Sequence, residues 1–293
     1  MSETSRFKYL RPEDIRRLQS FEFAPSLFVE GYLSGRHRSK HRGSSIEFRD
    51  YRQYVPGDDL ALVDWRVFAR TDRHFLRTFE QETNMECHIF LDSSASMGFE
   101  YKKMSKLDYA SFFAASLAYL VLKKGDRVSL QLFDDKIREF VPPGSTRRHM
   151  QSLMRLLENN HPGNETSVAE ALSRSYPLLK RRGTLVVISD FFDDSASIFK
   201  ALNPYLHRGF KIHLFHIITP QELSLEKQGL RTFVDMETGE RVVAHTDSIR
   251  AAYQQEMQDH IQHLRSYAMR RRVDYSVASL DTHFYQLFDH FSQ

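Results

Sequence analysis

Hydrophobic and polar positions change their period along the chain, and this change predicts where strands and helices lie. Strand candidates lie at 88–92, 127–133, 137–141, 184–189, 211–218 and 273–279. Apolar positions at helical spacing mark stretches between them, at 109–121, 148–157, 168–179, 197–207 and 249–268. Strands that alternate with helices predict an α/β fold with a doubly wound, mostly parallel sheet and helices on both faces.

Two segments depart from this alternation and predict antiparallel pairing. Residues 126–141 hold two strands joined at Asp135-Lys136, which predicts one antiparallel strand at an edge of the sheet. Residues 230–246 form a second hairpin candidate, with Glu237-Thr238-Gly239-Glu240 at its tip.

Residues 1–85 differ in character from the rest of the chain. They predict short helices after Pro12, after Pro25 as far as about Gly35, and at Trp65, with extended segments at 46–54 and 74–82. We therefore divide the chain into an N-terminal extension, 1–85, and a main domain, 86–293. We expect the extension to pack on the main domain, because its aromatic side chains need cover.

Composition narrows the class of protein. The 293 residues carry 41 basic and 38 acidic side chains, a balance that argues against a general nucleic-acid role. Cys87 is the only cysteine, so no intrachain disulfide can form, as is usual in a reducing compartment. The longest near-apolar run, 110–122, is shorter than the roughly 20 residues that span a bilayer. The sequence therefore predicts a cytoplasmic protein with no integral membrane segment.

Candidate chemistry gathers where the first buried strand ends. The run His88–Ser96 is an apolar strand that finishes in Asp-x-Ser-x-Ser, with Asp92, Ser94 and Ser96 as its oxygen-bearing positions. Oxygen-only ligand sets suit Mg²⁺, or Mn²⁺ and Ca²⁺, rather than zinc or copper. Taken alone, the same residues are also typical of a simple turn at a helix N-terminus.

Two further positions strengthen the metal interpretation. Thr166 lies in a polar loop just before a helix, and Asp190 ends the buried strand 184–189. In doubly wound sheets, ligands collect at the carboxyl ends of strands where the winding reverses. If 88–92 and 184–189 are neighbouring strands, the two aspartates converge there. We predict a metal site made of Asp92, Ser94, Ser96, Thr166 and Asp190.

The order of these residues resembles the metal-ion-dependent adhesion site of the von Willebrand factor A-like family, over roughly residues 85–293. That resemblance implies a Rossmann-like fold in which the serines, and in some states the threonine, bind the cation directly. The two aspartates often act through water. It also implies a coordination position left open for a partner's carboxylate, and hence a protein–protein interaction module rather than an enzyme.

A narrower resemblance comes from the N-terminal part. The stretch Ser44–Arg52, then Pro56-Gly57-Asp58-Asp59, Asp64-Trp65 and Ala69-Arg70, resembles the bacterial family called domain of unknown function fifty-eight. Members are typically encoded beside MoxR-type AAA+ ATPases. The resemblance therefore implies a MoxR-type ATPase as a partner, along with other proteins that offer an Asp or Glu to the metal.

The rim of the predicted site departs from the wider A-like pattern. Glu165 adds a charge, and Phe191-Phe192 follow Asp190 where glycine is usual, so we predict all three as partner-binding residues. Arg38 and Arg42, in the basic loop 36–42, are further candidates for binding phosphate or an acidic partner. For this basic loop as a whole, a simple solvated loop is the favoured interpretation.

The favoured function is thus a non-enzymatic module that binds a partner through the metal site, as an adaptor for a MoxR-type ATPase. The alternative is an Mg²⁺-dependent phosphoester hydrolase, for which Asp92 would have to act as nucleophile or direct ligand. Position 94, where a second acid would help such chemistry, is a serine. A third possibility is a nucleic-acid binder that uses the basic loop 36–42 and Arg270-Arg271-Arg272, but no recognised motif supports it.

Overall fold

The computed structural model describes residues 7–19, 46–54, 63–81, 85–163, 165–225 and 229–291. These fall into two compact units. The main unit contains 7–19 together with everything described from residue 85 onward. The second unit lies within 35–84 and is described by itself.

A six-stranded sheet forms the centre of the main unit, in the order β12-β9-β8-β3-β6-β7. Only β7 runs antiparallel to its neighbour, so the sheet is mostly parallel with one antiparallel edge, as predicted. The strands are β3 (Glu86–Asp92), β6 (Arg127–Phe133), β7 (Ile137–Gly144), β8 (Thr184–Ser189), β9 (Lys211–Ile218) and β12 (Asp274–Ser279).

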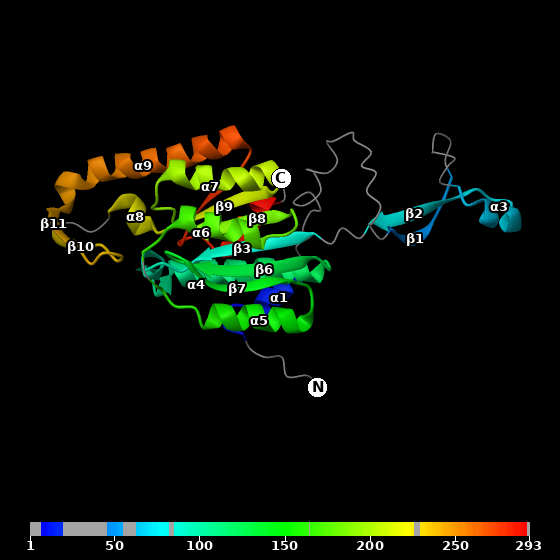
Figure 1. Cartoon of the computed structure of the whole chain (residues 1–293). Helices are drawn as coiled ribbons and strands as arrows, with labels where there is room; N and C mark the ends of the chain where they lie inside the picture. Colours follow the sequence, from blue (N-terminus) through cyan, green and yellow to red (C-terminus); the bar gives the residue numbers. More distant parts are fainter. Residues whose placement is uncertain are drawn as a thin grey trace. The chain divides into compact units, whose positions relative to one another are not determined.

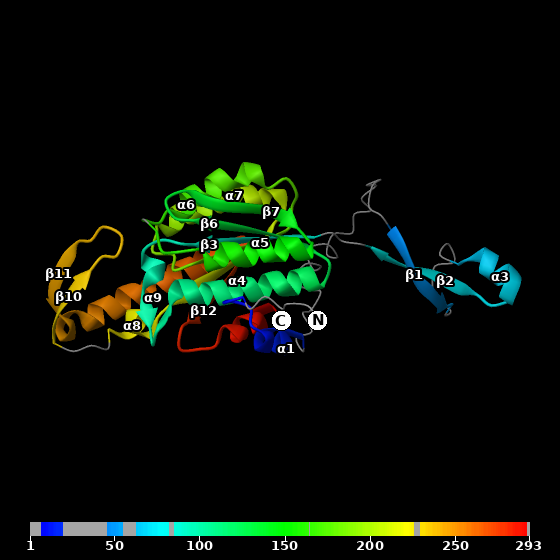
Figure 2. The same cartoon turned by 90° about the horizontal axis from the view of Figure 1, so that it is seen from below.

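Helices cover both faces of this sheet (Figures 1 and 2). One face carries α1 (Pro12–Gln19), α4 (Lys106–Lys123), α5 (Arg147–Glu158) and the 3-10 helix Phe284–Phe291. The other carries α6 (Val168–Ser175), α7 (Ser195–Arg208) and α9 (Thr246–Arg271). The predicted doubly wound α/β class is confirmed.

Side chains of the central strand alternate between the two cores. Ile89 and Leu91 pack on the α4 side, whereas Phe90 packs among α6 and α7. Every residue of β3 is buried. This explains the continuous apolar run in the sequence, since a parallel strand covered on both faces has no solvent side on which to place polar residues.

The start of the chain belongs to the main unit. Tyr9, Leu10 and Leu18 are buried in the core beside α4, and Tyr285 Oη donates a hydrogen bond of 2.7 Å to Asp14. Pro12 stands at the first position of α1, where its missing N–H costs nothing.

The second unit is small. It contains a strand pair, β1 (Ile46–Gln53) and β2 (Phe75–Gln81), and the short helix α3 (Trp65–Thr71). Asp64 caps α3 by accepting hydrogen bonds from the backbone N–H groups of Arg66 and Val67. The predicted helical stretch after Pro25 lies outside the described residues, as do Asp58 and Asp59.

The predicted hairpin at 230–246 is confirmed as β10 (Leu230–Val234) paired with β11 (Arg241–His245). Two small features have no counterpart in the predictions: the pair β4 (Glu100–Tyr101) with β5 (Met104–Ser105), and α8 (Pro220–Ser224). Among the described residues, no helix combines the length and the apolar character needed to cross a membrane.

A buried histidine in β3 predicts acid sensitivity. Burial, followed by the charge of Arg127, lowers the pKa of His88 to about 4. Below about pH 6.5, His88 therefore binds a proton more readily in the unfolded chain than in the folded chain. The free energy of unfolding falls as the pH is lowered through this range. We expect the protonation of His88 alone to lower the free energy of unfolding of wild type by about 2 to 3 kcal/mol between pH 7 and pH 4.5. Urea unfolding at both pH values, with His88→Gln as comparison, measures this; equal pH slopes in the two proteins would contradict it.

Candidate metal centre

The two aspartates of the predicted site end neighbouring strands. β3 pairs in parallel with β8, with Leu91 opposite Ile188, so Asp92 and Asp190 stand at the same edge of the sheet. From β3 the chain crosses to β6 on one side, and it later returns to β8 on the other. This is the reversal point at which doubly wound sheets bind their ligands. The structure thus brings together two carboxylates that lie 98 positions apart in the chain.

Asp92 is held in a fixed orientation. Its Oδ1 accepts a hydrogen bond of 2.9 Å from the backbone N–H of Ser94. Its Oδ2 accepts one of 2.5 Å from the hydroxyl of Ser189, at the end of β8. The side chain is fully buried. Asp92 therefore links the loop after β3 to the end of the adjacent strand.

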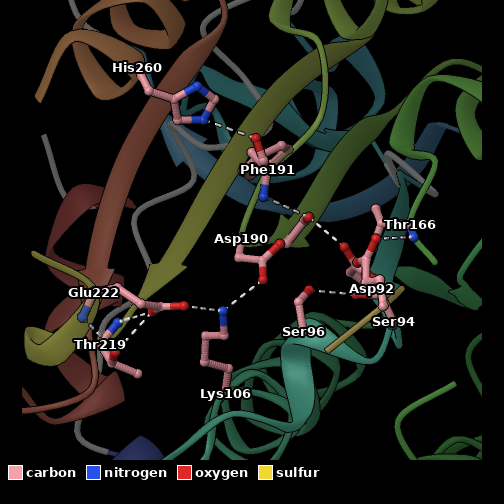
Figure 3. A network of polar contacts seen from close by, with 12 residues as sticks. Asp92, Ser94, Ser96, Lys106, Thr166, Asp190, Phe191, Thr219, Glu222 and His260 are labelled. Atoms are coloured by element: carbon pink, nitrogen blue, oxygen red, sulfur yellow. Dashed lines mark hydrogen bonds and ion pairs between the residues drawn. The ribbon is translucent and has the colours of Figure 1, made fainter. Parts of the chain in front are cut away.

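The hydroxyl positions lie around this carboxylate (Figure 3). Ser94 Oγ and Ser96 Oγ are 3.1 Å apart. Thr166 Oγ1 and Asp190 Oδ1 are buried and find no hydrogen-bond partner among the described residues. Buried oxygens without a partner are costly, so their presence needs an explanation. A hard divalent cation, which prefers oxygen ligands, would satisfy both atoms, and the residues present fit such an ion.

Backbone contacts fix the loops that carry these oxygens. Ser93 N donates to Phe133 O at 2.7 Å, and Gly163 N donates to Ser93 O at 2.6 Å. Asn160 Nδ2 also donates to Ser93 Oγ at 2.9 Å. The loop after β3 and the loop before α6 are therefore tied together at Ser93. This contact fixes Ser94 and Thr166 relative to each other.

A lysine that sequence reasoning missed completes the polar network. Lys106 Nζ lies 2.7 Å from Asp190 Oδ2 and 2.7 Å from Glu222 Oε1. Burial pulls the pKa of Lys106 down, but the charges of Asp190 and Glu222 outweigh it and raise the pKa. The ammonium is therefore charged, and it neutralises part of the acidity at the site.

Glu222 extends this network to the end of β9. Its other oxygen, Oε2, accepts hydrogen bonds from the backbone N–H and the hydroxyl of Thr219, at 2.8 and 2.9 Å. Thr219 Oγ1 in turn accepts from Glu222 N, which makes a reciprocal cap for α8. One connected set of contacts thus joins the carboxyl ends of β8 and β9 to the N-terminus of α4.

The electrostatics favour a divalent cation. Burial and then the nearby charge of Asp190 raise the pKa of Asp92, although hydrogen bonds from Ser189 and Ser94 oppose this shift. Asp190 and Glu222 share the ammonium of Lys106, whereas Asp92 is hydrogen-bonded to Ser94 and Ser189 and is affected by the charge of Asp190. Among the described residues, no group of three or more His, Cys, Asp or Glu side chains is placed to hold a metal. A cation bound here therefore uses hydroxyl oxygens as well as carboxylates.

Comparison with known proteins places the chain in a family. Residues 50–263 match the family model described as protein of unknown function DUF58. The chain belongs to the DUF58 family. Uncharacterized proteins of Mycobacterium bovis and Mycobacterium tuberculosis are each 26% identical to this DUF58 chain over 231 residues, which cover 78% of this chain and 72% of theirs.

Solved structures show weaker likenesses to this DUF58 protein. The conserved hypothetical protein BatB from Bacteroides thetaiotaomicron is 16% identical, with a TM-score of 0.47 over 71% of this chain and 97% of that one. An aerotolerance-related membrane protein from Bacteroides fragilis is 19% identical, with a TM-score of 0.49 over the same shares. A von Willebrand factor type A structure from Catenulispora acidiphila is 12% identical, with a TM-score of 0.33 over 48% and 35%. These values carry no inference about function.

The rim of the site in the DUF58 chain differs from expectation at one residue. The ring of Phe191 is fully buried in the core, so the prediction that Phe191 contacts a partner is wrong. Its backbone has φ of +50°, in the left-handed region that favours glycine, and His260 Nε2 lies 3.0 Å from its carbonyl oxygen. Phe191 therefore shapes the loop after Asp190 and presents no surface of its own.

The other rim candidates fare differently. Phe192 is 45% exposed and lies beside Lys106, whose Nζ is 5.2 Å from the ring centroid. Glu165 is exposed on the loop before α6. Both stay predictions as partner contacts. Arg38 and Arg42 lie outside the described residues.

Proposed function

We propose that this DUF58 protein is a non-enzymatic interaction module that binds a partner through a divalent cation. Asp92, Ser94, Ser96, Thr166 and Asp190 would hold Mg²⁺, or Mn²⁺ or Ca²⁺. The single observation that carries the proposal is a pair of buried oxygens, Thr166 Oγ1 and Asp190 Oδ1, which have no hydrogen-bond partner in the described part of the chain and lie near the two serine hydroxyls.

Neutral ligands matter to this function. A cation held largely by hydroxyls keeps most of its positive charge, and an incoming Asp or Glu from a partner supplies the missing negative charge. Lys106 acts in the same direction, because it already neutralises part of the charge of Asp190. Recognition would then depend on the metal and would select partners that present a carboxylate.

The partner we propose is a MoxR-type AAA+ ATPase, with the module acting as its adaptor in the cytoplasm. This proposal rests on the resemblance carried by the spaced motifs between Ser44 and Arg70; the match to the family model begins at residue 50. Purified MoxR-type ATPase from the same organism should be retained on the immobilised protein in Mg²⁺, and EDTA should release it.

The contacts of Asp92 do not favour the phosphoester hydrolase. Both of its oxygens accept hydrogen bonds within the protein, from Ser94 N and from Ser189 Oγ, and the side chain is fully buried. A nucleophilic carboxylate needs an oxygen that faces its substrate.

Metal titration tests the proposed site directly. We expect isothermal titration with Mg²⁺ and Mn²⁺ to show one site in wild type, and affinity about tenfold to a hundredfold weaker in Ser96→Ala, which removes one hydroxyl ligand.

Ser173→Ala is the control, because Ser173 is exposed on α6 and its hydroxyl donates to the backbone carbonyl of Ala169. It should retain the wild-type metal affinity and lose only some stability. Equal affinities in wild type and Ser96→Ala would exclude this hydroxyl as a ligand.

A further inference from the structure

The tip of the β10–β11 hairpin lies on the two loops that form the metal site. Glu237 Oε2 accepts a hydrogen bond of 3.2 Å from the backbone N–H of Thr166. On the other loop, the terminal methyl of Met236 lies close to Gly98, because a Cβ at this position would be 3.7 Å from it. Figures 1 and 2 both show the hairpin beyond the end of the sheet at which β3 finishes. The tip therefore contacts the loop before α6, and the end of the Met236 side chain lies close to the loop after β3.

Hydrogen bonds within the hairpin tip fix the turn that carries Glu237. Asp235 Oδ1 accepts hydrogen bonds from the backbone N–H groups of Glu237 and Thr238, at 2.8 and 3.1 Å. Gly239, with φ of +74°, closes the turn by donating to Asp235 O at 2.9 Å. These contacts hold the backbone of Glu237 in place, so little conformational entropy opposes the contact of its carboxylate with Thr166.

Thr166 links this carboxylate to the proposed cation. Its backbone N–H holds Glu237, while its own hydroxyl oxygen is buried and lacks a hydrogen-bond partner among the described residues. If Thr166 binds the cation, a carboxylate held at its backbone lies beside the position that an acidic side chain from a partner would take. Glu237 has the chemistry that such a partner must offer, and it is supplied by the same chain.

The rest of the hairpin is suited to movement. Among the described strands, β10 and β11 pair only with each other, and most of their residues are exposed. A lone two-stranded hairpin is marginally stable in water, so displacing its tip costs little compared with opening the main sheet. Its base is fixed to α9, since Thr246 N and Thr246 Oγ1 both donate to Gly229 O.

We propose that Glu237 is a carboxylate ligand for the cation supplied by the chain itself, so that the β10–β11 hairpin closes the site until a partner's Asp or Glu displaces it. This inference rests on the proposed metal site. It adds that the isolated protein is in a closed state, and that a partner must compete with an internal carboxylate.

Manganese binding and water relaxation test the inference without any partner. In Glu237→Gln the amide oxygen can still accept from Thr166 N, but the charge is gone. We expect Mn²⁺ affinity to fall roughly tenfold. We also expect water-proton relaxation by bound Mn²⁺ to rise, because a water replaces the carboxylate. Added N-acetylaspartate should then lower the relaxation of the variant and leave that of wild type unchanged.

Glu240→Gln is the control, since Glu240 is exposed on the same tip and its N–H donates only to Thr238. It should match wild type in both measurements. Mn²⁺ binding that is identical in wild type and Glu237→Gln, with identical relaxation, would overturn this inference and leave the metal site intact. Absence of Mn²⁺ binding to every variant would overturn the metal site and the inference together.

Discussion

Lys106→Met should destabilise the metal-free protein by about 3 to 5 kcal/mol, the usual cost of removing one partner from a buried ion pair. Lys106 is fully buried, and its ammonium contacts Asp190 and Glu222. Without it, these carboxylates lose the ammonium that they contact, while their desolvation cost remains. Chemical unfolding in EDTA, at neutral pH, measures the loss.

The same variant should bind Mg²⁺ more tightly than wild type. Removing a positive charge beside Asp190 strengthens the electrostatic attraction of the site for a cation. We expect the affinity for Mg²⁺ to rise by roughly tenfold. Saturating Mg²⁺ should therefore restore part of the lost stability, because a ligand that binds only the folded state stabilises it by mass action. If Lys106 had only a structural role, Lys106→Met would show no gain in metal affinity.

Two controls separate these effects. Lys200→Met removes an exposed lysine from α7 and should change neither stability nor metal affinity by a measurable amount. The double variant Lys106→Met/Glu222→Gln should lose less stability than the sum of the single variants, because the two side chains are in direct contact. Strict additivity would show that the ion pair does not couple them.

The position of Lys106 also explains why sequence reasoning missed it. It is the first residue of α4, next to the capping residue Ser105, and a lysine there opposes the helix dipole. Such a local mismatch is a signal for function, but its meaning depends on Asp190, which lies 84 positions away. No spacing rule relates the two residues. Only the pairing of β3 with β8 brings the start of α4 to the end of β8.

Other parts of the site follow from simple rules. Asp92 and Asp190 each end a run of buried residues, and parallel strands place such ends at one edge of the sheet. Their proximity could therefore be predicted once the two strands were taken as neighbours. The hairpin at 230–246 was equally predictable from its turn residues. The contact of its tip with Thr166 was not, because it depends on how a separate two-stranded element docks on the sheet.

Phe191 shows the opposite error. Its apolar side chain follows a site residue, which in sequence is typical of a rim that meets a partner. The structure instead buries the ring between α7 and the sheet, and a positive φ turns the chain so that only Phe192 is exposed. Two adjacent phenylalanines thus have different roles because one residue adopts a backbone conformation that L side chains rarely take.

Asp92→Asn should abolish most metal binding and yet stabilise the metal-free protein at pH 8. The asparagine keeps the size of the side chain and an oxygen for Ser94 N, but it removes one of two buried charges at the carboxyl ends of β3 and β8. Burial and Asp190 raise the pKa of Asp92, so its ionisation opposes folding. We expect Mg²⁺ affinity to fall by roughly 100-fold and the free energy of unfolding in EDTA to rise by about 1 to 3 kcal/mol.

The pH dependence gives the sign of this effect. A carboxyl whose folded pKa is raised keeps its proton longer in the folded state, so the stability of wild type falls as pH rises from about 4 through the raised pKa. Asp92→Asn lacks this fall, and the two proteins should converge near pH 4.5. Asp134→Asn is the matched control: Asp134 is also buried at this edge of the sheet but pairs with Arg138, so its replacement should destabilise the protein at pH 8. If Asp92→Asn instead destabilised the protein as Asp134→Asn does, Asp92 would be a structural carboxylate. The expected result is that Asp92→Asn is more stable than wild type at pH 8 in EDTA and less stable than wild type in Mg²⁺. That result would show that Asp92 lowers the stability of the metal-free protein in order to bind a cation.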